Sequence, residues 1–441
     1  MPAGSAGSSV AGATEAVVSS KKGARVREGP ELSSAACGEI AAGTVVTLGE
    51  RSCTVDGAVR VEIVSPLVGF VSRRCLRFGR ARKGGRLFAI SDVHSDHAEN
   101  LKWLRETFSG GAFARDGLIL AGDISSKMAV IRETLDLCAA SFEHVSFVVG
   151  NHDLWRERDE PFGDSLEKRR AILDHCRKLG IHTRPAHFCG CVVAPVESWH
   201  HQSWDTEPEV TGWTGLPKAE QCMSDYYRCT FPDLDMMTDQ VADYFDALND
   251  SGGLDGAIAD LRGAHPGSPL VTFSHFVPRI DLVPEKRFLY VPALNKAVGS
   301  RPLGDRIGRL APEAHVFGHT HFGWDATLDG TRYLQACLAY PSERTVRLTT
   351  VASGPCPHEA TALLVYDSAK AAFPPPYECG WSNFYKANER RPDVTHVVPD
   401  YVARAYKRVP GVGEVGWGDH VDMPAWKYGP KTALDSRTRH A

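Results

Sequence analysis

The sequence has no apolar run long enough to cross a membrane. Residues 1–22 are rich in Ala, Gly and Ser and lack the apolar core of a secretory signal peptide. We therefore expect residues 1–22 to be a disordered tail and the protein to be cytoplasmic. An organellar transit peptide stays open because Ser and Ala dominate this segment, although Glu15 is acidic and the first arginine is Arg25.

A strong charge of either sign is also missing. The formal net charge is −4, so the chain has no overall basic field to hold a nucleic-acid backbone. The 12 cysteines are scattered, and Cys189-Gly190-Cys191 is too closely spaced for the usual zinc-ribbon pair. This pattern favours a reduced intracellular chain with buried thiols, although the even number leaves disulfides open.

The 441 residues suffice for two or three domains. Between residues 23 and 79, short β-branched or alternating runs are separated by turn residues, which predicts a small β-barrel. Arg25–Pro30 and Gly69–Val71 resemble the opening and closing elements of Src-homology-three-like barrels. Such a barrel would bind a peptide or pack on a neighbouring part of the chain, and the scarcity of aromatic residues favours packing.

Beyond Gly85, apolar strands alternate with amphipathic helices, a pattern typical of a sheet covered on its faces. The predicted strands are residues 87–90, 118–121, 145–149, 192–196, 270–273, 316–317, 324–328, 332–336 and 363–366. The predicted helices are residues 99–108, 128–142, 164–179 and 237–248. We therefore predict an α/β domain over residues 84–350, with an insertion at about 199–267 and a C-terminal extension at 351–441.

Polar clusters follow five of these strands. They are Asp92-Val93-His94, Gly122-Asp123, Gly150-Asn151-His152-Asp153, Ser274-His275 and Gly318-His319-Thr320-His321. Ligands of open α/β sheets bind beyond the carboxyl ends of the strands, so we expect the clusters to meet in one crevice. Each has an alternative when taken singly: Asp123 could cap the following helix, and His275 could be a satisfied core histidine.

Together these clusters offer three carboxylate or amide oxygens and four imidazoles besides His152 and Asp153. Such donors suit manganese, iron or zinc. A compact site for one metal does not need so many donors. The set matches a two-metal centre, in which one carboxylate bridges ions about 3.5–4 Å apart.

The ordered motifs resemble those of the calcineurin-like metallophosphoesterases over roughly Arg86 to Arg344. The resemblance implies a two-layer β-sandwich flanked by helices, with the site at the strand ends. It also implies a first metal held by Asp92, His94 and His321, a second held by Asn151, His275 and His319, and a bridge formed by Asp123. By the same resemblance His152 faces the leaving group, and Asp153 hydrogen-bonds to His152 and orients it.

The predicted activity follows from this centre. A hydroxide that bridges two divalent ions is a competent nucleophile near neutral pH, and His152 can protonate the leaving oxygen. We therefore predict a hydrolase of phosphate monoesters or diesters of a small molecule or nucleotide. The alternatives are a nuclease, disfavoured by the lack of a basic stripe, a protein phosphatase, disfavoured by the bulky insertion, and a non-catalytic scaffold, which needs no complete ligand set.

Substrate contacts are predicted from position alone. Trp199 and His200 could line a pocket that stacks on a base or ring, or they could belong to the small core of a packed lid. Arg279 is placed to meet a phosphate oxygen, with a surface salt bridge as the competing role. Tyr340, beyond the last motif, is expected to be structural.

Overall fold

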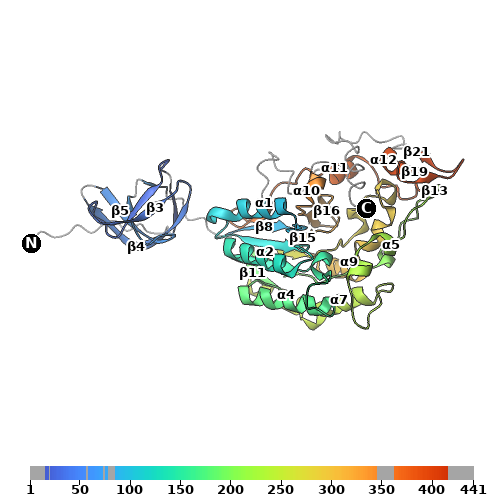
Figure 1. Ribbon diagram of the computed structural model, residues 1–441, viewed down its shortest axis with the longest axis horizontal. Helices are drawn as coiled ribbons and strands as arrows, with labels where there is room; N and C mark the ends of the chain where they lie inside the picture. The colour runs from blue at the N-terminus through green and yellow to red at the C-terminus, as the bar shows by residue number, and fades with distance from the viewer. Residues whose placement is uncertain are drawn as a thin grey trace, which may run out of the picture. The chain divides into compact units, whose positions relative to one another are not determined.

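The computed structural model describes residues 15–18, 20–55, 58–72, 75–77, 85–344 and 362–415. The described residues form two compact units (Figure 1). The first contains the described residues before Gly85 together with Phe108–Ala114, and the second contains the others. Among the described residues, no helix combines the length and the apolar character that crossing a membrane requires.

The first unit is an antiparallel sheet with the strand order β3-β2-β6-β5-β4-β1-β7. Its strands are β1 (Glu15–Val18), β2 (Ala24–Arg27), β3 (Ala36–Ile40), β4 (Val45–Val55), β5 (Ala58–Ser65), β6 (Gly69–Ser72) and β7 (Leu76–Arg77). Buried aliphatic residues, among them Val26, Val61 and Ile63, form its core. The pairings among the described residues leave β3 and β7 as edge strands, so they do not show the closed barrel that the sequence predicts.

Strand β1 corrects the prediction of a tail over residues 1–22. It pairs with β4 and β7, and the Val18 side chain is 1% exposed within the core of the first unit. Burial of this valine and the ladder hydrogen bonds offset the entropy of ordering the segment. Residues 1–14 lie outside the described residues.

Within the described residues, the second unit contains two sheets of mixed direction that pack face to face. The first sheet has the order β10-β9-β8-β18 and the second the order β11-β12-β14-β15-β17-β16. The strands of the first sheet are β8 (Arg86–Ile90), β9 (Gly117–Ala121), β10 (His144–Val148) and β18 (Leu363–Asp367). Those of the second are β11 (Ala186–Phe188), β12 (Cys191–Pro195), β14 (Leu270–Phe273), β15 (Ala314–Phe317), β16 (Trp324–Leu328) and β17 (Thr331–Gln335).

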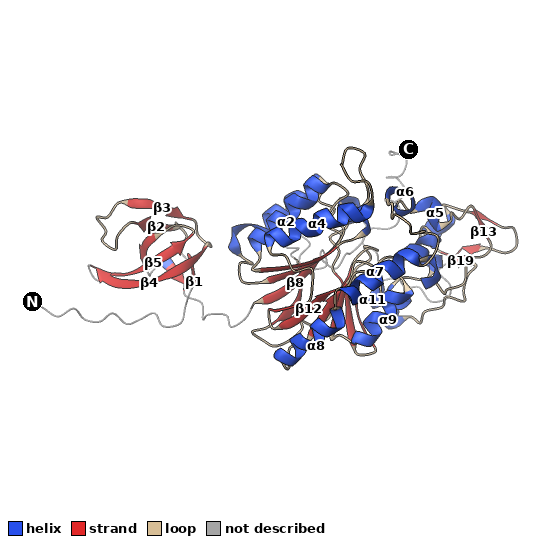
Figure 2. Ribbon diagram, turned by 90° about the horizontal axis from the view of Figure 1, so that it is seen from below, coloured by secondary structure: helices blue, strands red, loops and turns tan. Residues whose placement is uncertain are grey.

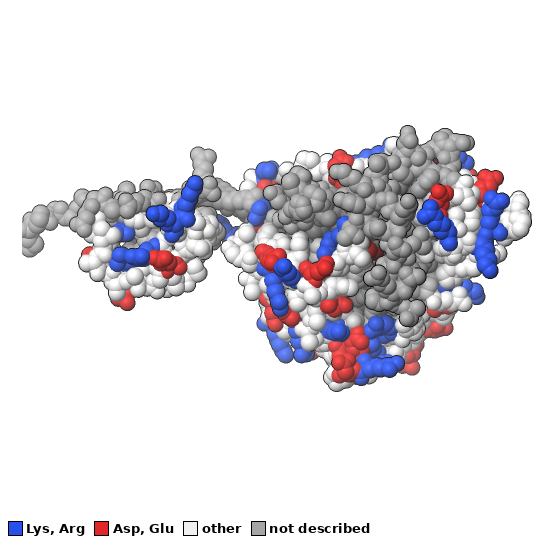
Figure 3. Space-filling view, turned by 45° about the horizontal axis from the view of Figure 1, so that its top comes forward, with Lys and Arg blue, Asp and Glu red and all other residues white. Residues whose placement is uncertain are grey.

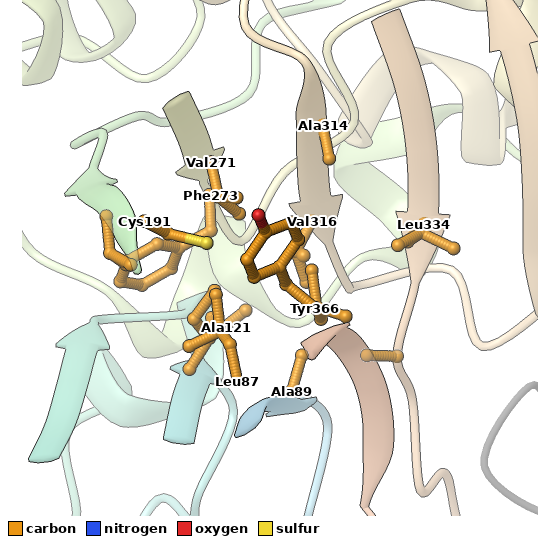
Figure 4. Packing of buried hydrophobic residues seen from close by; sticks show 14 of the residues in the cluster. Leu87, Ala89, Ala121, Cys191, Val271, Phe273, Ala314, Val316, Leu334 and Tyr366 are labelled. Carbon is orange, nitrogen blue, oxygen red and sulfur yellow. The ribbon is translucent and has the colours of Figure 1, made fainter. Parts of the chain in front are cut away.

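One hydrophobic cluster fills the space between the two sheets (Figure 4). Leu87 and Ala121 reach it from the first sheet, and Val271 and Val316 from the second. Helices cover the outer faces, with α2 and α4 over one sheet and α8 against β12 of the other (Figure 2). Strand β9 is consequently buried along its whole length, as its continuous apolar run predicts. The second unit is therefore a two-layer sandwich flanked by helices.

The predicted helices form close to their expected bounds. The longer helices are α1 (Ala98–Phe108), α2 (Met128–Ser141), α4 (Ser165–Leu179), α7 (Gln240–Ser251), α8 (Leu254–Ala264), α9 (Arg301–Leu310) and α11 (Gly380–Ala387). Helix α4 shows how the sequence sets the ends. The Asp164 carboxylate accepts the Glu167 N–H at 2.7 Å, and Gly180 ends the helix with φ of 71°.

The insertion lies between β12 and β14. It contains β13 (Trp213–Thr214), α5 (Ala219–Cys222), α6 (Asp225–Arg228), α7 and α8. The C-terminal extension meets both the insertion and the sandwich, because β13 pairs with β20 (Lys407–Arg408) and β18 joins the first sheet. The sandwich therefore includes a strand from the segment that the sequence assigns to the extension.

Candidate metal centre

The predicted ligands all come from segments that follow the carboxyl ends of parallel strands. Asp92 and His94 follow β8, Asp123 follows β9, and His275 follows β14. Asn151 opens the short helix α3 (Asn151–Leu154) after β10. His319 and His321 follow β15. The strand order brings these segments to one edge of the sandwich, where the ligand crevice of such sheets lies.

The backbone at the ligands is strained. Five of them have positive φ angles, namely Asp92 (50°), His94 (38°), Asp123 (57°), His319 (76°) and His321 (55°). A left-handed conformation costs a non-glycine residue about 1–3 kcal/mol, and it persists where neighbouring structure imposes it. Neighbouring backbone does so here: Asp92 N–H donates to Gly122 O at 3.0 Å, and His94 N–H donates to Asp123 O at 3.0 Å. The fold thus stabilises a geometry that these residues would not adopt alone.

Two glycines of the motifs let the segments approach each other. A Cβ atom at Gly150 would lie 2.2 Å from Asp123 Oδ1, and a Cβ atom at Gly318 would lie 2.6 Å from Asp92 Oδ2. Both distances are far below van der Waals contact, so any side chain at either position would displace an acidic ligand. The two glycines are required for close approach to the ligands.

The first ligand cluster consists of Asp92, His94 and His321, whose donor atoms lie within 4.8 Å of one another. His321 Nε2 lies 3.1 Å from His94 Nε2 and 3.3 Å from Asp92 Oδ1. The other nitrogen of His321, Nδ1, donates to Glu343 Oε2 at 2.6 Å, in α10 (Pro341–Arg344). This bond orients the imidazole so that Nε2 faces the cluster.

The second ligand cluster consists of Asp123, His275 and His319, with Asn151 beside them. Backbone carbonyls orient its two imidazoles. His275 Nδ1 donates to Ala121 O at 3.0 Å, and His319 Nε2 donates to Ala297 O at 2.8 Å. Because a carbonyl only accepts, these nitrogens carry the protons, and His275 Nε2 and His319 Nδ1 are left with lone pairs.

These two nitrogens, His275 Nε2 and His319 Nδ1, lie 3.2 Å apart. Asn151 Oδ1 lies 2.9 Å from His275 Nε2 and 3.0 Å from His319 Nδ1, and it is also an acceptor. Three acceptor atoms therefore converge, and none of the three carries a proton with which it could hydrogen-bond to the others. Such a set of nitrogens and oxygens fits a divalent cation.

His152 lies beside both clusters. Its backbone N–H donates to Asp123 Oδ1 at 2.9 Å, and its ring nitrogen Nε2 lies 3.9 Å from Asp123 Oδ2. The ring stacks on Trp155 with centroids 3.6 Å apart. Its side chain is 18% exposed, so it can reach a bound substrate.

The contacts of Asp153 correct the expectation that it hydrogen-bonds to His152. Its carboxylate accepts backbone N–H groups from four residues instead, at 2.8–3.2 Å: Gly150, Asp123, Ile124 and Ser125. Asp153 thereby ties the segment after β9 to the segment after β10. It holds the backbone of Asp123, whose Oδ1 atom accepts the His152 N–H.

Comparison with known proteins agrees with this geometry. The family model described as calcineurin-like phosphoesterase matches residues 85–323. The chain is a calcineurin-like phosphoesterase. It is also 34% identical over 274 residues to the protein named [acyl-carrier-protein] phosphodiesterase PptH of Mycobacterium tuberculosis strain H37Rv, covering 58% of this chain and 78% of that relative. This phosphoesterase is thus a phosphoric ester hydrolase of a family that uses divalent metals.

The phosphoesterase also aligns with solved structures. The structure of phosphopantetheinyl hydrolase (PptH) from Mycobacterium tuberculosis aligns with a TM-score of 0.44 and 20% identity, covering 59% of this chain and 92% of that chain. The structure of TT1561 from Thermus thermophilus aligns with a TM-score of 0.30 and 15% identity, covering 58% of this chain and 90% of that chain.

Electrostatics of the phosphoesterase site favour a bound cation. Burial lowers the pKa of His94 and of His275, and it lowers the pKa of His319 to about 3, so these ligands are neutral at pH 7. Burial and then the nearby Asp92 raise the pKa of Asp123. A cation between the two carboxylates would offset their repulsion and favour the ionised form of Asp123.

The residues predicted to contact substrate are placed differently from one another. Trp199 is 1% exposed and packs on Phe231 and Phe245 of the insertion and on Phe276 after β14, so it belongs to a buried aromatic core. Arg279 pairs with Asp281 at 2.9 Å and Asp329 at 2.5 Å, the competing role that the sequence allows. Both placements favour the structural alternatives that the sequence leaves open, a packed lid core for Trp199 and a surface salt bridge for Arg279.

His200 lies closer to the metal centre but is 3% exposed. Its Nε2 atom donates to Asp225 Oδ2 at 3.1 Å. Asp225 Oδ1 in turn accepts from Asn151 Nδ2 at 2.8 Å. His200 therefore contacts the second cluster through a carboxylate, and its burial argues against contact with substrate.

Sequence reasoning missed three side chains at the site of the phosphoesterase. Tyr340 stacks on His94 with centroids 4.3 Å apart, and its hydroxyl lies 3.5 Å from His152 Nε2. Glu343 binds His321, and Asp225 binds Asn151. These residues lie in short helices or loops without a motif, so no spacing in the sequence indicates them.

Proposed function

We propose that this chain is a phosphodiester hydrolase with two divalent metal ions. The observation that carries the proposal is the convergence of acceptor atoms in the second cluster, beside a separate cluster around Asp92. In this proposal Asp92, His94 and His321 hold one ion, and Asn151, His275 and His319 hold the other. Asp123, whose carboxylate lies 3.4 Å from His275 Nε2, bridges the two.

Bound divalent ions would activate water for attack on phosphorus and offset the charge of the phosphate oxygens. The chain's own residues supply the other requirements. His152 Nε2 faces the site and can offer a proton to the leaving oxygen. Tyr340 Oη, 3.5 Å from that nitrogen, can donate a second hydrogen bond on the same side. Trp155 stacks on the His152 ring and limits its rotation.

We propose a diester rather than a monoester because the relative of Mycobacterium tuberculosis is named a phosphodiesterase of acyl carrier protein. The phosphodiester of a carrier protein is accordingly the first natural substrate to test. A nucleotide or another small phosphodiester is the second. A nuclease role has less support, since acidic and basic side chains are interspersed on the face of the second unit seen in Figure 3.

The test uses the full chain, stripped of metal by a chelator and then loaded with manganese. We expect hydrolysis of a bis-aryl phosphodiester and of a carrier-protein phosphodiester, and slower hydrolysis of an aryl phosphomonoester. Asp233→Asn is the matched control for acidic site variants, because Asp233 is exposed and has φ of 61°, a conformation that asparagine tolerates. A manganese-loaded chain that cleaves only monoesters would contradict the diester proposal.

We further propose that the first unit closes into a small Src-homology-three-like barrel that packs within the chain or binds a peptide. Its antiparallel order and its aliphatic core support this. Hydrogen exchange of the full chain tests closure, because pairing of β3 with β7 would protect their outward amides. Rapid exchange in both strands would favour an open sheet.

A reducing compartment is also proposed, supported by free thiols such as Cys138 and Cys176.

A further inference from the structure

The buried carboxylate of Asp225 joins three segments of the second unit. Asp225 is 3% exposed and is the first residue of α6, in the insertion. Its Oδ1 atom accepts from Asn151 Nδ2 at 2.8 Å and from Trp155 Nε1 at 2.6 Å, and its Oδ2 atom accepts from His200 Nε2 at 3.1 Å. Three donors thus satisfy one carboxylate that has little contact with water.

The bond to Asn151 determines which end of its amide faces the second cluster. An ionised carboxylate only accepts hydrogen bonds, so Asn151 must present its NH₂ group to Asp225 and its Oδ1 atom to His275 and His319. Without Asp225 the amide could rotate by about 180°. Its NH₂ group would then donate to the lone pairs of the two histidines and occupy the position of a cation.

The bond to Trp155 extends the same control to His152. The Trp155 ring stacks on the His152 ring at 3.6 Å, with an interplanar angle of 28°. The guanidinium of Arg228, at the other end of α6, lies 4.8 Å from the Trp155 ring centroid and pairs with Glu157 at 2.6 Å. Helix α6 therefore holds Trp155 by two contacts: Asp225 accepts the indole N–H, and Arg228 lies over the indole ring.

His200 holds Asp225 in place, because its Nε2 atom donates to Asp225 Oδ2 at 3.1 Å and both side chains are buried. The His200 ring is itself fixed, because it packs against Phe276 and Tyr226.

We infer that Asp225 is a positioning residue, by which the insertion orients the Asn151 amide for metal binding and holds Trp155 against His152. This inference rests on the proposed function, since it needs a metal at the second cluster. It gives the insertion a role in assembling the metal centre itself.

The first experiment compares manganese binding by the metal-free full chain with that of Asp225→Ala. Free Mn²⁺ is measured by its electron paramagnetic resonance signal during titration. We expect the wild-type chain to bind two ions and the variant to bind one of them about 10–100-fold more weakly, the usual effect of losing an outer hydrogen-bond partner. Asp233→Asn should bind both ions as the wild type does.

A second pair of variants separates positioning from folding. In Asn151→Asp the ligand is a carboxylate with two equivalent oxygens, which needs no orientation, and Asp225 becomes a nearby like charge. Adding Asp225→Ala to this variant should leave manganese affinity unchanged or raise it. If Asp225→Ala lowers the affinity equally in the wild-type chain and in the Asn151→Asp variant, its role is purely structural and the inference is overturned.

The outcomes also separate this inference from the proposed function. A wild-type chain that binds no manganese would overturn the proposed function and the role of Asp225 with it. If the wild-type chain binds two ions and the Asp225→Ala variant binds both with the affinity of the wild type, only the role of Asp225 is overturned. Thermal unfolding of the metal-free proteins is measured alongside, so that any loss of fold is seen directly.

Discussion

The two ligand clusters arise from the same kind of strand-end motif, yet different parts of the chain support them. The first cluster depends on the segment that follows strand β17. There Glu343 orients His321, and Tyr340 stacks on His94. Both supporting side chains lie shortly after the end of β17 at Gln335.

The second cluster has support from backbone and from the insertion. The carbonyls of Ala121 and Ala297 orient its histidines, and Asp225 orients Asn151. A carbonyl at this position cannot be removed by a side-chain substitution, whereas the carboxylate of Asp225 can. The comparison teaches that the ligands are local features of the strand ends, while their orientation depends on segments far away in the sequence.

Asp123→Asn should have the largest effect, because Asp123 is the one ligand that the proposal assigns to both clusters. Replacing a carboxylate oxygen by an amide nitrogen removes a negative ligand from each ion. We expect phosphodiesterase activity to fall to the level of the metal-free chain, with weaker binding of both manganese ions. Loss of only one ion would show that Asp123 belongs to a single cluster.

His152→Ala should separate chemistry from metal binding. Proton transfer by a positioned side chain contributes about 10²–10⁴-fold, so we expect kcat to fall by that factor. Manganese affinity should stay nearly unchanged, since His152 is assigned to neither ion. Equal losses in turnover and in metal affinity would contradict the assignment of His152 to the leaving group.

Glu343→Gln tests the first cluster alone. An amide can still contact His321 Nδ1 but lacks the charge that strengthens the bond, so we expect one manganese ion to bind about 10–100-fold more weakly. The ion affected should differ from the ion affected by Asp225→Ala, and the two variants combined should weaken both. Glu389→Gln, at an exposed position, is the control. If both variants weaken the same ion, the division of support between the clusters is wrong.

Tyr340→Phe should have the smallest effect. The variant keeps the ring that stacks on His94 and removes only the hydroxyl near His152. A neutral hydrogen bond contributes about 0.5–1.5 kcal/mol, which corresponds to a decrease of about 2- to 10-fold in kcat. Metal affinity should be unchanged. A loss of metal with kcat preserved per bound ion would assign Tyr340 to support of the first cluster only.

Much of the sandwich could be predicted because its strands are buried on both faces and their apolar runs are continuous, as in Leu118–Ala121. Strand β1 was missed because four residues in an Ala- and Ser-rich segment carry little pattern; its burial depends on partners in β4 and β7. Helix α8 was missed for a related reason. Gly256 and Gly263 interrupt it, and its stability comes from packing on β12.

The convergence of the ligands could be predicted because each motif directly follows a predicted strand, and the carboxyl ends of such strands face one crevice. The contacts of Asp153 could not, since its four backbone donors come from two loops whose separation only the fold determines. Arg279 lies near the ligand His275 in sequence, but its guanidinium pairs with Asp329, which lies between β16 and β17. Asp225 belongs to no sequence motif, because its role requires only a single carboxylate that the fold brings to the Asn151 amide.

The central claim is that two metal ions lie in the two clusters with Asp123 between them. Anomalous X-ray scattering from crystals of the manganese-loaded chain tests it most directly. We predict two peaks, one among Asp92, His94 and His321 and the other among Asn151, His275 and His319. A single peak, or peaks away from these side chains, would contradict the claim.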